Sequence, residues 1–247
     1  MTQIKGVFFD LGGTLRIAER IPEYELAARD RMAALAGFSD PESFMNLVED
    51  RYKNNYRVWA LGENKESGDY ELWAKWLLPE LPKDKIQKIC HELTYQYRQF
   101  NGKRHVVEGG VEVIQQLKKR GYKLGIISNL IGENEIYDWL KEDGLDIYFD
   151  SVVLSSVWHL RKPDPEMYLI GCRELGLAPE ECASIADNLN RDITGAKAAN
   201  IGLNVLIIDE EKLKTKKITD ENRPDLIIHR FPQILEIDRL QGVKCDD

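Results

Sequence analysis

The segment Gly6-Val-Phe-Phe-Asp-Leu-Gly-Gly-Thr14 decides the fold of this 247-residue chain. Its apolar run predicts a buried strand over residues 6–9, which places Asp10 at the carboxyl end of that strand. In an open parallel sheet, ligands gather outside the carboxyl ends of the strands, so a carboxylate at this position is placed for chemistry. An aspartate followed by two glycines also forms an ordinary turn, so this segment alone leaves both interpretations open.

From Val106 onward, strand-like runs alternate with helical periods. Helices are expected around 111–117, 133–143, 165–175 and 193–199, and glycines follow the first three. The expected strands are 124–127, 151–154, 183–186, 205–208 and, at the edge, 225–228. This alternation predicts an α/β fold, a doubly wound and mainly parallel sheet with helices on both faces.

The segment between the first strand and Val106 has a different character. It has few β-branched runs and predicts four helices, over 23–36, 42–61, 70–77 and 83–100, divided by glycines and prolines. We therefore expect an all-helical insertion over residues 16–105, in a core made of residues 1–15 and 106–247. Trp59, Trp73 and Trp76 fall in the insertion and favour a small helical core of its own over a ligand-lining role.

Two further segments place polar groups beside these elements. Ser128 and Asn129 follow the strand 124–127, where a hydroxyl can donate to a phosphoryl oxygen, although Ser-Asn is also a common loop opening. In the run Arg161-Lys162-Pro163-Asp164-Pro165, Asp164 can cap a helix that begins at Pro165. That leaves Lys162 at a helix N-terminus, where an anion is attracted, or as a solvated lysine beside a cap.

The last segment is Asp187-Asn-Leu-Asn-Arg-Asp192, directly after the strand 183–186. Two carboxylates five residues apart across a strand-to-helix turn can point into one site, and oxygen ligands of this kind suit Mg²⁺. Turns rich in Asp and Asn are also ordinary helix caps.

Taken in order, the four segments resemble the haloacid dehalogenase-like superfamily of phosphoryl-transfer hydrolases, in the subfamily with a C1-type helical cap inserted after the first motif. The resemblance implies that Asp10 is the nucleophile, which forms an aspartyl phosphate that water then hydrolyses. It implies a hydrogen bond from Ser128 to a transferring oxygen and charge neutralisation by Lys162. It implies Mg²⁺ as cofactor and contacts with the substrate from a further set of residues. The implied ligands of Mg²⁺ are Asp10, the carbonyl of Gly12, Asp187 and Asp192, and the implied substrate contacts are Gly12, Gly13, Thr14 and Asn129.

Gly12 departs from the family pattern, which has a second aspartate there to protonate the leaving group and activate water. Loss of a positioned general acid costs about 10² to 10⁴ in rate. Three interpretations follow: a slow or leaving-group-selective Mg²⁺ phosphatase, a phosphonatase- or dehalogenase-like hydrolase, or a non-catalytic protein that binds a phosphorylated metabolite. Phosphonatases of the family use a cap lysine as a Schiff base, and this cap contains Lys53, Lys65 and Lys75. Dehalogenases of the family need no Mg²⁺, so the retained acidic pair argues against that branch.

Composition narrows the class of partner. The chain carries 34 Lys and Arg against 42 Asp and Glu, a formal net charge of -8, so we expect no nucleic acid partner. The resemblance to the haloacid dehalogenase-like superfamily implies a small phosphorylated substrate instead. The four cysteines form no CxxC pair, and the apolar run near the N-terminus is too short for a signal or a membrane span, so we expect a cytoplasmic protein without membrane contact. The sequence does not distinguish a monomer from a homodimer, and both stay open. The four histidines lie in unrelated contexts and are expected to be surface or packed residues.

Overall fold

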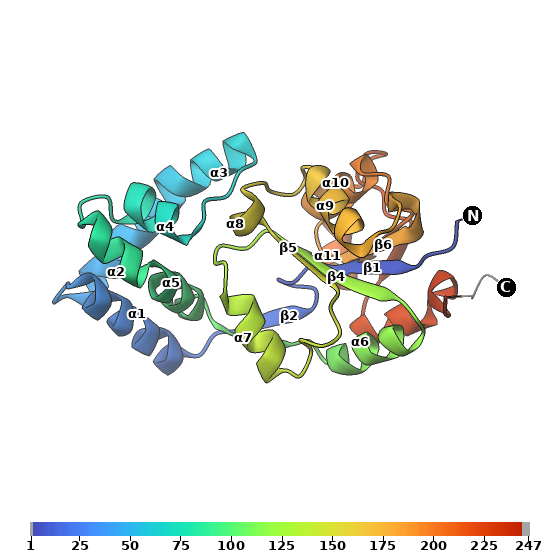
Figure 1. Cartoon of the computed structure of the whole chain (residues 1–247), viewed down its shortest axis with the longest axis horizontal. Helices are drawn as coiled ribbons and strands as arrows, with labels where there is room; N and C mark the ends of the chain where they lie inside the picture. The colour runs from blue at the N-terminus through green and yellow to red at the C-terminus, as the bar shows by residue number, and fades with distance from the viewer. Residues whose placement is uncertain (1, 244–247) are drawn as a thin grey trace.

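The central element is a six-stranded, wholly parallel sheet in a computed structural model that describes residues 2–243 (Figure 1). Its strands, in spatial order, are β5 (Ser151–Leu154), β4 (Lys123–Ser128), β1 (Gly6–Phe9), β6 (Cys182–Ala186), β7 (Leu203–Ile207) and β8 (Leu226–Ile228). The strand that sequence places first is thus in the middle, between β4 and β6. This confirms the expected parallel α/β fold.

Helices cover both faces of the sheet because side chains alternate along β1. Val7 and Phe9 join a core with α6 (Gly110–Lys119) and α7 (Glu135–Glu142). Phe8 joins a separate core with α9 (Glu166–Leu175) and α10 (Thr194–Ala198). All three β1 side chains are at most 1% exposed, so a doubly wound arrangement buries the strand on both sides.

A helical lobe follows β1 in the chain and lies beside the sheet (Figure 1). Its helices are α1 (Pro22–Ala36), α2 (Pro41–Arg51), α3 (Arg57–Glu63), α4 (Asp69–Glu71) and α5 (Lys83–Phe100), with π-helical turns at Tyr52–Tyr56 and Leu72–Leu77. The lobe has its own apolar core, in which Trp73 is fully buried and the rings of Trp59 and Trp76 stack 4.8 Å apart. The three tryptophans therefore fill a helical core, as expected.

The prediction of a wholly helical segment over 16–105 is wrong at its two ends. β2 (Arg16–Glu19) and β3 (Lys103–Val106) pair antiparallel, with Arg16 opposite Val106. Their sequences, RIAE and KRHV, are charged and short, so neither carries a strand signal alone. The pairing forms only because the chain leaves and re-enters the core at one place. The borders at residues 15 and 105 stay predictions.

The remaining elements are short, and no helix of the described part of the chain is long and apolar enough to cross a membrane. They are α8 (Ser155–Trp158), α11 (Glu210–Lys214), the π turn Leu189–Ile193 and 3-10 turns at Pro179–Glu181, Phe231–Glu236 and Asp238–Leu240. Cys90, Cys172 and Cys182 are buried free thiols, and Cys245 lies outside the described residues.

Candidate active site

The carboxyl ends of three neighbouring strands bring the polar segments together. Phe9 is in register with Ile126 of β4 and Ile185 of β6. Asp10 follows Phe9 directly, and Ser128 and Asp187 stand two residues past its partners, so all three side chains emerge at one edge of the sheet. The structure thus places the sequence-predicted residues of three separate segments in one site.

Lys162 forms the centre of this site. Its Nζ lies 2.7 Å from Asp10 Oδ1 and 2.6 Å from Asp192 Oδ1, and it donates to the backbone oxygen of Ile127 at 2.7 Å. The three charged side chains are at most 3% exposed. Ser128 Oγ is 3.5 Å from the same Asp10 oxygen. A buried ammonium between two buried carboxylates replaces the solvated lysine that the sequence left open.

The backbone around Lys162 is fixed by polar contacts on both sides. Asn129 accepts from the backbone N–H of Lys162 at 2.8 Å and donates to its carbonyl at 2.9 Å. The preceding Arg161 forms an ion pair with Glu66, a carboxylate of the helical lobe that is 1% exposed. Asn129 therefore positions Lys162, and its predicted contact with substrate stays a prediction. Asp164 accepts from the N–H of Glu166 at 2.9 Å, close to the expected cap.

Three carboxylates form a group that fits a cation. Asp10, Asp187 and Asp192 each offer an oxygen within 4.8 Å of the others'. Burial, then the charges of Asp10 and Asp192, raises the pKa of Asp187 to about 6. Burial likewise raises the pKa of Asp10 against the effect of Lys162. Crowded carboxylates that resist ionisation, with oxygen donors only, are the donor set that Mg²⁺ takes in proteins.

Arg191 belongs to the site, although the sequence analysis did not select it. Its Nη2 is 3.4 Å from Asp10 Oδ2, 3.4 Å from Asp187 Oδ1 and 2.8 Å from Asp192 Oδ2. Although burial opposes ionisation, Lys162 and Arg191 hold the pKa of Asp192 below its usual value. One guanidinium thus touches all three candidate metal ligands. Its spacing of four residues from Asp187 on the turn was the only signal for it.

The two glycines after Asp10 differ in what they allow. A Cβ on Gly12 would meet nothing within 4 Å, so a longer side chain fits there. Gly13 has φ +85°, and a Cβ there would lie 2.3 Å from Asp187 Oδ2, so only glycine is compatible with the observed Asp187 position. Thr14 is 1% exposed, and its hydroxyl has no hydrogen-bond partner among the described residues. The predicted roles of these residues in binding substrate stay predictions.

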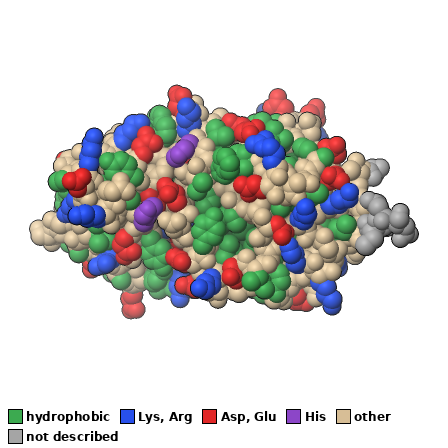
Figure 2. All heavy atoms as spheres, viewed as in Figure 1, with side chains coloured by type: hydrophobic (Ala, Val, Ile, Leu, Met, Phe, Trp, Pro, Cys, Tyr) green, Lys and Arg blue, Asp and Glu red, His purple; other side chains and the backbone are tan. Residues whose placement is uncertain are grey.

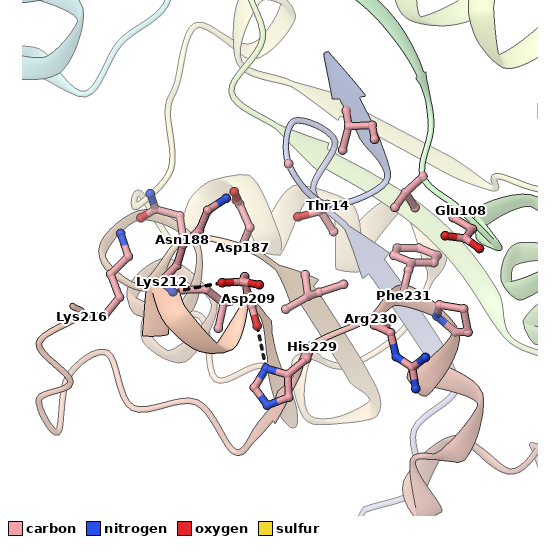
Figure 3. A pocket seen from close by; sticks show the side chains of 16 residues that line it. Thr14, Glu108, Asp187, Asn188, Asp209, Lys212, Lys216, His229, Arg230 and Phe231 are labelled. Carbon is pink, nitrogen blue, oxygen red and sulfur yellow. Dashed lines mark hydrogen bonds between the residues drawn. The ribbon is translucent and has the colours of Figure 1, made fainter. Parts of the chain in front are cut away.

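A cavity of about 510 Å³ opens beside Asp187. Figure 3 shows Lys212 and Lys216 on one side of it and Arg230 on the other, with Asp187 and Thr14 between them. Val107 and Phe231 supply apolar lining. The cavity can therefore hold a small molecule with both polar and apolar parts next to Asp187, which is the one member of the acidic group that lines it.

Known proteins resemble the chain over nearly its whole length. A family model described as haloacid dehalogenase-like hydrolase matches residues 4–200. A glyceraldehyde 3-phosphate phosphatase of Pyrococcus furiosus is 26% identical over 96% of this chain and 94% of its own length. The pyrophosphatase PpaX of Bacillus cereus is 34% identical over 95% of this chain and 96% of its own. A 2-haloacid dehalogenase structure from Pseudomonas syringae covers 94% of this chain and 97% of its own at 20% identity, with a TM-score of 0.65.

Fold, site and family model together define an enzyme of the hydrolase class. More particularly, the chain belongs to the haloacid dehalogenase-like family. The assignment to the subfamily with a C1-type cap stays a prediction.

Proposed function

We propose that this protein is a Mg²⁺-dependent phosphatase that hydrolyses a small phosphate monoester through an aspartyl phosphate on Asp10. The observation that carries the proposal is the placement of Lys162 Nζ 2.7 Å from Asp10, beside the carboxylates of Asp187 and Asp192. Phosphoryl transfer asks a protein mainly for positioning and charge stabilisation, which this arrangement provides.

The proposed reaction has two displacements at phosphorus. An Asp10 oxygen attacks the phosphorus in line, the bond to the ester oxygen breaks, and the alkoxide leaves with a proton from solvent. Water then attacks the phosphorus, gives up a proton, and releases orthophosphate and the Asp10 carboxylate. Lys162 favours the ionised form of Asp10 against the effect of burial and orients its side chain, and Ser128 is placed to donate to a phosphoryl oxygen. Bound Mg²⁺, held by Asp10, the Gly12 carbonyl, Asp187 and Asp192, would supply positive charge for the phosphoryl oxygens.

The lysines of the helical lobe do not favour phosphonatase chemistry. Lys53 pairs with Glu49 at 2.9 Å and Lys75 with Glu71 at 2.8 Å, and both are more than half exposed. Lys65 is exposed as well. A Schiff-base lysine works from a desolvated pocket, which none of these occupies. The acidic group around Asp187 favours the metal-dependent branch over the dehalogenase branch.

A small anionic phosphate ester is the substrate class that the cavity and the relatives support. The rim residues Lys212, Lys216 and Arg230 suit a second acidic or polar group on the substrate. Relatives are named for glyceraldehyde 3-phosphate and for pyrophosphate, both small phosphorylated compounds. On the face drawn in Figure 2, basic and acidic side chains are interspersed rather than gathered in a basic stripe, which agrees with a small-molecule substrate.

A panel of small phosphate esters, assayed with Mg²⁺ and with EDTA on the wild type and on Asp10→Asn, tests the proposal. We expect turnover that needs both Mg²⁺ and Asp10. Equal activity in EDTA would point to metal-free substitution chemistry. Saturable, Mg²⁺-dependent binding without Asp10-dependent turnover would support the metabolite-binding alternative.

Gly12→Asp is expected to raise kcat on an alkyl phosphate about tenfold or more. The new carboxyl enters open space and supplies part of the missing general acid, whose full effect is about 10² to 10⁴. The gain should be smaller on an aryl phosphate, because its leaving group needs less protonation. Gly12→Asn is the matched control with the same shape and no acid. An equal gain in both variants, or none in either, would contradict this expectation.

Arg191→Met is expected to tighten Mg²⁺ binding about tenfold, equivalent to about 1.4 kcal/mol. The substitution removes a positive charge that touches all three carboxylates, and the methionine keeps much of the packing. Titration calorimetry measures the Kd, and Arg173→Met, which removes an exposed arginine paired with Glu166, is the control. Unchanged or weaker Mg²⁺ binding in Arg191→Met would show that the guanidinium does not compete with the cation.

A further inference from the structure

A second group of metal-ligating side chains lies where the helical lobe meets the core. Asp69 of α4, His91 of α5 and Glu133 of the loop after β4 each offer a ligand atom within 4.8 Å of the others'. Figure 1 shows α4 and α5 next to each other in the lobe, and the two helices are in contact. Glu133 accepts from the backbone N–H of Asp69 at 2.7 Å, so the group joins the two parts of the molecule.

Asp69 is a buried carboxylate whose negative charge is only partly compensated by its neighbours. Its side chain is 3% exposed, and Oδ2 lies 2.6 Å from His91 Nδ1. Oδ1 is buried and has no hydrogen-bond partner among the described residues. The Thr94 hydroxyl accepts from Trp73 Nε1 at 2.8 Å and lies 3.0 Å from the Cys90 carbonyl, so the one proton that it could donate to Asp69 is shared with that carbonyl. Burial raises the pKa of Asp69 against the effect of the His91 hydrogen bond.

The surroundings are acidic and open to solvent on one side. A cavity of about 150 Å³ adjoins the group, and its lining includes five carboxylates and one histidine but no lysine or arginine. His91 is about half exposed, which gives a cation a path to the buried Asp69. Gly68 leaves room for the carboxylate, because a Cβ there would lie 2.5 Å from Glu133 Oε1. An imidazole with two carboxylates is the donor set of a borderline divalent cation such as Zn²⁺. Two other carboxylates of the lining are paired with arginines, Glu135 with Arg98 and Glu92 with Arg31.

We propose that Asp69, His91 and Glu133 form a second metal site, distinct from the acidic group around Asp10, that binds Zn²⁺ or a similar divalent cation between the helical lobe and the core. The donor sets separate the two sites, since Mg²⁺ prefers oxygen ligands and imidazole suits Zn²⁺ and Co²⁺. A cation held there ties α4 and α5 to the loop after β4.

Calorimetric titration of the full chain with Zn²⁺, in excess Mg²⁺ to fill the oxygen-only site, tests this proposal. We expect one Zn²⁺ per chain, with affinity at least about tenfold weaker in His91→Gln and in Glu133→Gln. Two variants control for other sites. Asp187→Asn, in the acidic group around Asp10, and His105→Gln, an exposed histidine of β3, should leave Zn²⁺ affinity unchanged. Co²⁺ in place of Zn²⁺ should give a visible absorption spectrum that His91→Gln changes.

Two results would overturn the proposal. One is that the wild type, His91→Gln and Glu133→Gln bind Zn²⁺ with the same affinity, or that the wild type does not bind Zn²⁺ at all. The other is Zn²⁺ binding that disappears in Asp187→Asn, which would place the cation at the acidic group. If His91→Gln lowers the Tm of the metal-free protein, the Zn²⁺ affinity of Glu133→Gln is compared with that of the wild type instead. The calorimetric titration and the Co²⁺ spectrum do not depend on phosphatase activity, so failure of this proposal would leave the proposed function untouched.

Discussion

Asp10→Asn is expected to lower kcat for a phosphate monoester by at least about 10⁴-fold, because an amide oxygen is a poor nucleophile toward phosphorus. The substitution is isosteric, so Lys162 can still donate to the remaining oxygen at the position of Oδ1. Steady-state assays with the best ester of the substrate panel measure the loss, and substrate binding should change much less.

Asp150→Asn is the matched control for that loss. Asp150 directly precedes β5, so it lies at the amino ends of the strands, whereas Asp10 lies at their carboxyl ends. Its side chain pairs with Lys118 on the surface. Asp150→Asn removes the same charge at a position outside the site, so kcat should stay within about twofold of the wild type. Activity in Asp10→Asn comparable to that of Asp150→Asn would exclude Asp10 as the nucleophile.

Lys162→Met is expected to lower the free energy of unfolding by about 3–5 kcal/mol at neutral pH. The ammonium lies between Asp10 and Asp192. Its removal leaves two buried carboxylates facing each other with Arg191 as their remaining cationic partner, at 3.4 Å from Asp10 and 2.8 Å from Asp192. Urea denaturation measures the change. Adding Asp192→Asn to the variant removes one of the stranded charges and should restore part of the stability. Lys118→Met, which breaks only the surface pair with Asp150, should lose no more than about 1 kcal/mol.

The pH dependence of that loss has a definite sign. The folded-state pKa of Asp192 lies below its ordinary value of 3.8, so its ionised form contributes stability above that value and loses it as pH falls through the folded pKa. Lys162 is one cause of this shift. The advantage of the wild type over Lys162→Met should therefore shrink under acid conditions. Two results would contradict the view that Lys162 compensates the buried carboxylates. One is a stability difference between the wild type and Lys162→Met that stays below about 1 kcal/mol at neutral pH, and the other is a difference that grows as the pH falls.

The meeting of Asp10, Ser128 and Asp187 follows from sequence because each stands just after a strand of one parallel sheet. The carboxyl ends of such strands share an edge whatever the loops do. The helical lobe is predictable for a similar reason, since periodic apolar positions and glycine or proline breaks act over short range.

What sequence could not supply depends on contacts between distant residues. Lys162 looks like a solvated side chain until the fold closes Asp10 and Asp192 around it. Arg191 is one of many charged residues in turns, and only the folded site shows that it touches three carboxylates. The pairing of β2 with β3 joins segments about ninety residues apart in sequence, so no local pattern announces it.

The most direct test of the proposed mechanism is to trap the covalent aspartyl phosphate. Wild-type protein is mixed with the ester and Mg²⁺, quenched in acid within one turnover and treated with borohydride, which reduces an acyl phosphate to the alcohol with loss of phosphate. The protein is then digested, and the reduced residue is located by its mass change in mass spectrometry. We expect modification at Asp10, in the peptide that contains Gly6–Phe9, and at no other residue. A reduced side chain at a different residue, or complete turnover with Asp10 unmodified at every quench time, would contradict a phosphoryl transfer centred on this carboxylate.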